Sequence, residues 1–587
     1  MSAPASIARP RLGAVLAWGA WTVMSAAALM LLARFASNVP SWDDWDMVPV
    51  LTHNQPVTWD WLWSQHNEHR VPLPRLLFLG LDRLTVTDMR VTMYFDVLVM
   101  AALAAAMLLA AARLRGRPGA ADAFFPVALL NWGQAANMLW GWQLQFFASV
   151  ALACVALLAI VRAGAELPPR RAAAIVGLCA VLLPLCGANG LGMVPALAAW
   201  PLAIALLPES WTGAPGSRSD KLLLALGGVA LVLTAVYFVG WQPVPYHPKS
   251  RSVHQTLETA LQFLTIGLGP ATRGSWPVSG LVTLAVFAAT AALTSRVWRE
   301  RPGERARAAG LLCFLAALAS LALGLGLGRD GFETRYVTLA LPAWCAVYFA
   351  WSLYGGRISA PARATLALAA LAAVWGNTAF GLGYARELRA QLGGFEHDMA
   401  SGIPAHELLH RYGTWLHPHQ EITARYLPML RRAGVGRFAA LREDPPMRTI
   451  PLDLHPIETT QLTWQDSTAR VAGPRPALRF RLPADRLATG VRLRYRYLSD
   501  DRTLPYISLR WKPRNAREFD PAHFYKYSPT GDRANWERGS WDAVHDSATT
   551  LTVWISDTVG EISITPDFRP AVFHIDELSL LVPDGSR

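Results

Sequence analysis

The sequence predicts a polytopic α-helical membrane protein that ends in a C-terminal β-sandwich outside the membrane. Of its 587 residues, 52% are hydrophobic and only 16% are charged, whereas a soluble domain carries about a quarter charged residues. The apolar residues gather in long runs without Asp, Glu, Lys or Arg, and short alternating runs replace them from about residue 455. These observations exclude a plain soluble enzyme, a disordered chain and a fibrous repeat.

The apolar runs are the predicted transmembrane helices, because about 20 apolar residues are needed to cross a bilayer. A cleaved signal peptide is the alternative for the first run, but that run is longer than a usual signal-peptide core. About eleven spans are predicted, at 12–34, 91–112, 121–133 (short), 145–162, 172–187, 190–207, 221–240, 278–296, 308–327, 335–354 and 363–384.

Arginine-rich loops follow every second predicted span, near residues 113–117, 162–171, 218–221, 296–307 and 357–363. This alternation is what the positive-inside rule requires. It predicts a cytoplasmic N-terminus and a C-terminal region outside. The net charge of +12 is explained by these loops, and no basic stripe interleaved with aromatic residues indicates a nucleic-acid partner.

Three regions follow from this pattern. Residues 1–384 form a transmembrane domain with a first outer loop at 35–89, residues 385–450 show helical spacing and form a connector, and residues 451–587 form the sandwich. All five cysteines lie in apolar stretches, which indicates packing rather than disulfides. Aromatic residues of the sandwich could form a sugar-binding platform or core: Trp511, Phe524, Tyr525, Tyr527, Trp536 and Trp541.

The first outer loop holds the most informative residues. Asp43, Asp44 and Asp46 come directly after the first span, and carboxylates beside a membrane are costly unless they are solvated or used. One interpretation is a solvated loop. The other is a general base at the membrane edge.

A basic and acidic cluster follows in the same loop: His66, Glu68, His69 and Arg70. These side chains could orient the base and bind a phosphate. His66 and His69, with Glu68 adjacent, could also hold a divalent metal. The segment lacks the HExxH pattern, and no third ligand is identifiable, so no metal site is assigned. Residues 70–86 are predicted to form a helix in the membrane interface rather than a span.

Further polar residues lie on the predicted outer side or inside spans. Arg335, Arg329, Lys249 and Arg251 are the cations that could bind a phosphate, although an arginine at a membrane edge often only snorkels. Asp96 is an intramembrane acid and therefore a functional candidate. The amides of one aromatic-rich segment could read sugar hydroxyls or join helices: Asn131, Gln134, Asn137, Gln143 and Gln145.

This layout resembles the GT-C superfamily of membrane glycosyltransferases, such as the lipid A aminoarabinose transferases and protein mannosyltransferases. The resemblance covers about residues 1–384 and rests on the acidic pair after the first span and on the HNEHRVPLP segment. That segment stands where those families carry Lys-Pro-Pro-Leu or His-Pro-Pro-Leu. The tail ending FHIDELSLLV resembles the last strand of a jelly-roll carbohydrate-binding module.

The resemblance implies an inverting transferase of a bacterial inner membrane, facing the periplasm. Asp44 or Asp43 would deprotonate an acceptor hydroxyl, and a polyprenyl-phosphate sugar would be the donor, with a glycan, lipid or protein as acceptor. No cofactor is implied. A transporter or flippase of a lipid-linked sugar is the alternative, and it would require inverted repeats and broken helices; neither is evident from the sequence. An O-antigen ligase-like enzyme or a non-catalytic sugar sensor are further alternatives.

Overall fold

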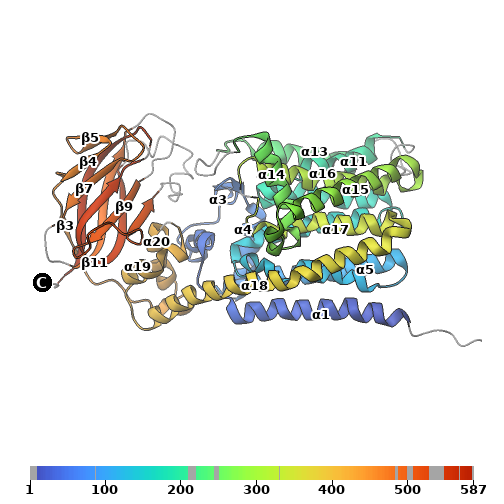
Figure 1. Cartoon of the computed structure of the whole chain (residues 1–587), viewed down its shortest axis with the longest axis horizontal. Helices are drawn as coiled ribbons and strands as arrows, with labels where there is room; N and C mark the ends of the chain where they lie inside the picture. The colour runs from blue at the N-terminus through green and yellow to red at the C-terminus, as the bar shows by residue number, and fades with distance from the viewer. Residues whose placement is uncertain are drawn as a thin grey trace, which may run out of the picture. The chain divides into compact units, whose positions relative to one another are not determined.

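The computed structural model describes residues 9–85, 87–208, 220–242, 250–329, 331–418, 420–482, 487–498, 507–527, 548–567 and 569–584. The chain forms two compact units. The helical unit comprises Met1–Ser37 and Leu62–Arg389, and the tail unit comprises Asn38–Trp61 and Ala390–Arg587. The helices of the first unit gather in one bundle, and the strands near the C-terminus gather in one sheet (Figure 1).

The helical unit is built from long apolar helices. In the described part of the chain, eight helical stretches are long and apolar enough to cross a membrane, and two shorter apolar helices accompany them. These ten correspond to ten of the eleven predicted spans. The eight contain α1 (Arg9–Phe35), α5 (Arg90–Arg115), α8 (Leu144–Arg162), α9 (Pro169–Leu182), α15 (Val278–Glu300), α16 (Arg305–Gly326), α17 (Tyr336–Tyr354) and α18 (Ser359–Ala400), and the shorter two are α11 (Val194–Leu206) and α13 (Lys221–Tyr237).

The eleventh predicted span, at 121–133, is wrong as a continuous helix. The predicted range overlaps three short elements, η2 (Ala120–Ala123), α6 (Phe124–Leu130) and η3 (Trp132–Gln134), and two more follow directly, α7 (Ala135–Met138) and η4 (Gly141–Gln143). The Asn131 side chain causes the first break. Its Nδ2 donates to the carbonyl of Ala128 at 2.8 Å, and its Oδ1 accepts from the N–H of Gly133 at 2.9 Å. Side-chain hydrogen bonds of this kind replace the helical ladder.

The broken segment contacts α17 at two well-separated positions. Near one end of α17, the Tyr348 hydroxyl donates to Asp122 Oδ1 at 2.6 Å. Near the other end, Asn137 Nδ2 donates to Thr338 Oγ1 at 2.6 Å. Ten residues of helix, about 15 Å, separate Thr338 from Tyr348. The short helices therefore follow α17 in pieces over about half of the ~30 Å of a bilayer core, which is a feature that the sequence did not reveal.

The loops of the helical unit carry shorter elements. The predicted helix at 70–86 is confirmed as α4 (Pro72–Thr85), whose 14 residues are too few to span a bilayer. The remaining elements are β1 (Gln65–His66), β2 (His69–Arg70), η5 (Leu183–Cys186), α10 (Ala188–Leu191), α14 (Val253–Thr265), η6 (Ile266–Leu268), η7 (Pro270–Ser275), η8 (Pro302–Glu304) and η9 (Gly356–Ile358).

Helix α18 continues well beyond its predicted span. It has 42 residues and is therefore about 63 Å long, twice the ~30 Å of a bilayer core. No helix end occurs at 385, where the connector was expected to begin. From Ala390 onward the helix belongs to the tail unit.

The tail unit combines short helices with a sheet. Its helices are η1 (Trp42–Met47), α2 (Val48–Leu51), α19 (Ala405–Leu416), α20 (Gln420–Arg432) and η10 (Gly436–Ala440), and α3 (Trp59–Trp63) leads along the chain into the helical unit. The strands are β3 (Met447–Pro451), β4 (Glu458–Thr460), β5 (Leu462–Gln465), β6 (Thr468–Val471), β7 (Ala477–Arg481), β8 (Leu487–Tyr497), β9 (Ile507–Pro513), β10 (Phe524–Tyr527), β11 (Thr549–Thr565) and β12 (Val572–Pro583).

The ten strands form one antiparallel sheet in the order β10-β9-β11-β8-β12-β6-β5, with β3 on β12, β7 on β11 and β4 on β7. Strand β11 explains how the sheet folds on itself. Its first half pairs with β8, and its second half, from Val559, pairs with β9 and β7. Register shifts on β11 mark the change of partners. The predicted antiparallel sheet is confirmed, and it is nearly closed because both halves share one strand.

Alternating apolar side chains fill the inside of this folded sheet. Trp511 and Tyr525 belong to the buried core, so they are not part of a sugar-binding platform. Phe524 is 37% exposed, so its ring is accessible to a sugar. The side chains of Tyr527, Trp536 and Trp541 lie outside the described residues.

Candidate functional site

The three acidic residues of the first loop lie on one short 3-10 helix, η1, and have different environments. Asp44 is 1% exposed, Asp46 is buried and Asp43 is half-buried. Asp44 Oδ2 accepts a hydrogen bond from the backbone N–H of Ser41 at 3.1 Å, and the Asp44 N–H donates to the Ser41 carbonyl at 3.1 Å. This is a capping box. One face of the Asp44 carboxyl group therefore holds the start of η1.

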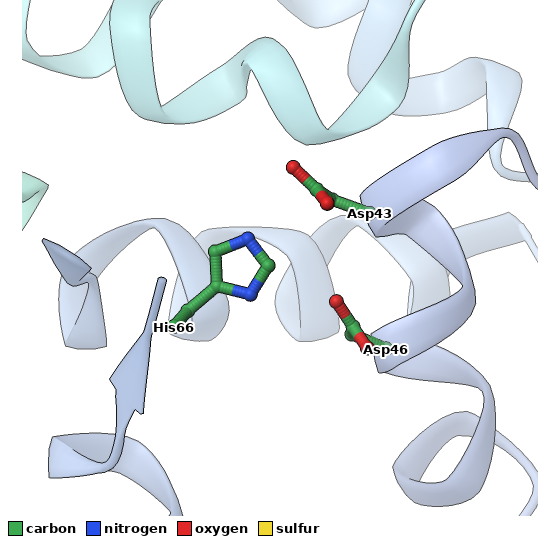
Figure 2. Close-up of side chains that lie close together, drawn as sticks. All are labelled: Asp43, Asp46 and His66. Carbon is green, nitrogen blue, oxygen red and sulfur yellow. The ribbon is translucent and has the colours of Figure 1, made fainter. Parts of the chain in front are cut away.

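Asp43 and Asp46 are three residues apart, so they lie on the same side of a 3-10 helix. Figure 2 shows both side chains projecting from η1.

Arg70 is the last residue of β2, in the short hairpin of β1 and β2. Its Nε, Nη1 and Nη2 donate to the carbonyls of Tyr237, Trp63 and Val239 at 3.0, 2.7 and 2.9 Å. The Tyr237 hydroxyl accepts from the Arg70 N–H at 2.9 Å. These bonds fasten the hairpin to the end of α13. Three of the five guanidinium N–H groups are thus used by the protein itself, although Arg70 was predicted to bind phosphate.

His69 and Glu68 form a connected pair on the same hairpin. The Ala188 N–H donates to His69 Nδ1 at 3.1 Å, so His69 carries its ring proton on Nε2 in the neutral form. Nε2 lies 3.1 Å from Glu68 Oε1, and the same carboxylate forms an ion pair with Arg329. Burial lowers the pKa of Arg329. The sequence predicted all three as site residues, and the structure brings them together around one carboxylate.

His66 points to a different partner from its neighbours. Its ring is buried and lies 4.8 Å from the Trp142 ring, at an interplanar angle of 59°. Packing on an indole holds the imidazole plane in place. The two histidines of HNEHR therefore have different environments: His69 is hydrogen-bonded into the hairpin network, and His66 packs on the aromatic segment before α8.

Arg335 lies at the start of α17. Its guanidinium lies over the Trp140 ring at 5.4 Å, and its Nε donates to Glu333 at 3.3 Å. Its side chain is 33% exposed, and no described residue accepts a hydrogen bond from its two terminal nitrogens. An arginine held by an aromatic ring with its terminal N–H groups open can bind a phosphate. Of the other predicted cations, Arg251 is exposed and Lys249 lies outside the described residues.

The amides of the aromatic-rich segment divide into two groups. Asn131 and Gln134 are satisfied within the broken helix and α17, since Gln134 donates to the Leu129 carbonyl and accepts from Thr338. Gln134 thereby joins the broken helix to α17, as one of the two interpretations proposed, whereas the Asn131 side chain bonds within its own segment. Buried carbonyl oxygens of the other three have no partner among the described residues: Asn137 Oδ1, Gln143 Oε1 and Gln145 Oε1.

Two buried acids stand apart from these groups. Asp96 is fully buried in α5, and neither of its carboxyl oxygens has a partner among the described residues. Asp82 of α4 is also buried, and burial raises its pKa to about 6. Asp82 was not among the residues predicted from the sequence. Its spacing of seven from Arg75 and four from Phe78, both buried on the same helix, was the signal that could have found it.

Comparisons with known proteins do not assign this chain to a family. No protein-family model and no curated protein matches it. Among solved structures, it is similar to a family GH115 4-O-methyl-α-glucuronidase with specificity for decorated arabinogalactans, at 12% identity and a TM-score of 0.16. That match covers 70% of this chain and 41% of the glucuronidase, and a likeness so weak carries no argument.

Proposed function

We propose that the chain is a membrane glycosyltransferase of the GT-C type, which moves one sugar from a polyprenyl-phosphate carrier to an acceptor on the periplasmic face of a bacterial inner membrane. The observation that carries the proposal is the acidic helix η1. It begins seven residues after the first apolar helix ends at Phe35 and presents Asp43 half-buried. A carboxylate in that position is suited to general-base catalysis at a membrane edge.

Asp43 is the preferred base, because the Asp44 carboxyl group caps the start of η1. The Ser41 N–H occupies one oxygen of Asp44, and Asp44 is almost fully buried, whereas Asp43 is partly accessible. Asp46 lies on the same side of η1 as Asp43 and helps to position the acceptor. The resemblance left the choice between Asp43 and Asp44 open, and their different environments favour Asp43.

The proposed reaction is an inverting displacement. Asp43 takes the proton of an acceptor hydroxyl while its oxygen attacks C1 of the sugar. The bond between C1 and the phosphate oxygen breaks, and the polyprenyl phosphate leaves with the electron pair. Fixed positive charge must stabilise the leaving phosphate. Arg335 is the first choice for that role, because Trp140 fixes its guanidinium while the terminal N–H groups stay open.

The hairpin residues have supporting roles in this proposal. Arg70 fastens the hairpin through main-chain carbonyls, and the Arg329–Glu68–His69 network fixes its tip. These residues are therefore positioning residues. Direct phosphate contacts had been expected for Arg70. Among the partly buried candidate cations that the structure describes, Arg335 has the most N–H groups from which no described residue accepts a hydrogen bond.

Purified protein in nanodiscs tests the proposal directly. It is given a polyprenyl-phosphate sugar and a mixture of envelope glycans and lipids, and release of polyprenyl phosphate is measured. Turnover that stops in Asp43→Asn supports the proposal. Turnover of nucleotide sugars in place of the lipid-linked donor would contradict the carrier mechanism.

A transporter of lipid-linked sugars is the second candidate, because one observation favours it. The segment from Ala120 to Gln143 is a broken helix beside α17, which is a feature of transporters. Transport and transfer are distinguished by chemistry. A flippase moves the labelled lipid-linked sugar between leaflets and leaves the sugar–phosphate bond intact, whereas the transferase cleaves it.

A further inference from the structure

The tail unit has a row of polar and aromatic side chains across five neighbouring strands. In the sheet register, Phe524 of β10 lies opposite Arg510 of β9, and Arg510 lies opposite Ser563 of β11. Ser563 lies opposite Arg479 of β7, which lies opposite Glu458 of β4. Residues directly opposite each other share one face of a sheet, so this row continues from edge to edge on one face.

That face points away from the hydrophobic core. Side chains alternate between the two faces of a strand, and the neighbours of the row, Leu478, Phe480, Leu509, Trp511, Ile562 and Ile564, all belong to the buried core. Arg479 has a side chain that is 40% exposed, and Arg510 and Phe524 are exposed. Arg479, Arg510 and Phe524 are therefore open to solvent, whereas Ser563 at the centre of the row is buried. We call this surface the Arg/Phe face.

Aromatic rings hold the cations of this face in place. Arg510 lies over the Phe524 ring at 5.3 Å, and Arg479 and Lys512 lie over the Phe519 ring at 5.5 and 5.7 Å. Such contacts restrict a guanidinium without neutralising its charge. The face is thus a set of fixed positive charges rather than freely moving side chains.

The positive charges on the Arg/Phe face exceed the negative ones. Lys512 pairs with Glu561 at 2.8 Å, and Arg479 pairs with Glu458 at 2.7 Å. Arg510 forms no ion pair with any described residue. Arg481, also exposed, lies on the same face in register with Glu561. Four basic residues therefore stand against two acidic ones: Arg479, Arg481, Arg510 and Lys512 against Glu458 and Glu561.

We infer that the Arg/Phe face binds an anionic glycan, a sugar chain that carries carboxylates. Arg510 has no ion pair with a described residue, and Arg479 pairs with Glu458 while its side chain stays 40% exposed. The two are two strands apart, which corresponds to about 10 Å, so one extended oligosaccharide can reach both. Guanidinium groups bind carboxylates in a bidentate geometry, and the exposed ring of Phe524 offers an apolar surface to a sugar ring. An anionic membrane surface fits less well, because interfacial binding needs several exposed apolar side chains around the cations.

A binding measurement on the full-length protein in nanodiscs of neutral lipid tests this inference. The probes are a hexamer of galacturonic acid and a neutral hexasaccharide of glucose, and the readout is the dissociation constant by calorimetry. The test variant is Arg479→Gln/Arg510→Gln, with Phe524→Ala as a second variant. The matched control is Arg492→Gln/Arg494→Gln, which removes two arginines of β8 in the other half of the folded sheet. The thermal midpoint of each variant is measured to check that it folds.

The hexa-uronate is expected to bind and the neutral hexamer is not. Loss of two charge-assisted contacts is expected to weaken uronate binding by about tenfold or more in the test variant, with less than about twofold change in the β8 control. Equal binding of the two probes, or equal loss in both double variants, overturns the inference. Binding of anionic vesicles without uronate binding would assign the face to a membrane surface instead. No sugar transfer is measured, so the outcome is independent of the proposed function.

Discussion

The carboxyl group of Asp44 accepts a hydrogen bond from the backbone N–H of Ser41 at 3.1 Å, at the start of the acidic helix that follows the first apolar helix. This bond separates two neighbouring aspartates into different roles. Asp44 holds the turn together, and Asp43, one residue earlier, keeps its carboxylate partly accessible. The three-residue spacing of a capping box places the cap on Asp44 rather than on Asp43.

Because Asp44 caps η1 and Asp43 is the proposed base, removal of the charge should abolish activity only at Asp43. Truncation of the Asp44 side chain should lower stability. Asp44→Asn keeps an acceptor oxygen for Ser41 and should retain most activity, whereas Asp44→Ala should destabilise the protein by about 1 kcal/mol. Asp43→Asn should lose transfer activity and keep its thermal midpoint. Initial rates and thermal midpoints of the three variants check this. Loss of activity in Asp44→Asn with a normal midpoint would instead make Asp44 the base.

Arg335 should act mainly on the chemical step. Removing a fixed donor from a developing negative charge typically lowers kcat by about a hundredfold, so Arg335→Gln is expected to lower kcat far more than it raises KM. Arg251→Gln is the matched control, because Arg251 is an exposed cation predicted for the same side. Initial rates against donor concentration separate the two parameters. A pure rise in KM would show that Arg335 only helps to bind the donor.

The ion pair of Glu68 and Arg329 should stabilise the hairpin more than an exposed pair does. Both side chains are mostly buried, so loss of one partner leaves the other unpaired. Glu68→Gln or Arg329→Gln is expected to lower stability by about 1–3 kcal/mol, and the double variant by less than the sum. Thermal midpoints in detergent measure these changes.

The control for that pair is Arg296 and Glu300, which form an exposed i,i+4 pair. Its removal should change stability by less than about 0.5 kcal/mol. If both pairs gave the same small change and the single variants simply added, the network around His69 would have no structural role.

Asp82 predicts a pH dependence of stability. Burial raises its pKa to about 6 from an ordinary value of 3.8, so between these values the folded protein binds more protons than the unfolded chain. Stability should therefore fall as pH rises from about 4 to about 6, by at most about 3 kcal/mol, and stay lower above that range. Asp82→Asn should remove this decrease and raise the thermal midpoint at pH 7.5 but not at pH 4. An identical pH profile for both proteins would contradict the prediction.

The fold followed from the sequence wherever a strong pattern existed. Long apolar runs gave ten of eleven helices, and period-two alternation in segments such as 487–497 and 572–583 gave the strands of the tail. The segment at 121–133 failed because the side chain of Asn131 bonds to its own backbone. The mean hydropathy of a segment does not reveal a single amide side chain whose hydrogen bonds replace those of the helix.

The candidate functional site could be predicted from the sequence only in part. The residues of HNEHR were found from their chemistry, but the duties of Arg70 and His69 depend on Tyr237 and Ala188, which are more than a hundred residues away in the chain. Hydrogen bonds at that separation leave no local pattern. The cap formed by Ser41 and Asp44 was different, because Ser41-Trp42-Asp43-Asp44 has the capping-box spacing and could have been recognised from the sequence.

The most direct test of the transferase is the mass of envelope glycans in a strain that lacks the gene. The strain is restored with wild type, Asp43→Asn or Asp44→Asn at equal expression. Deletion is expected to remove the mass of one sugar unit. Wild type and Asp44→Asn are expected to restore it, and Asp43→Asn is not. Full restoration by Asp43→Asn would contradict a catalytic role for η1 and favour the transporter.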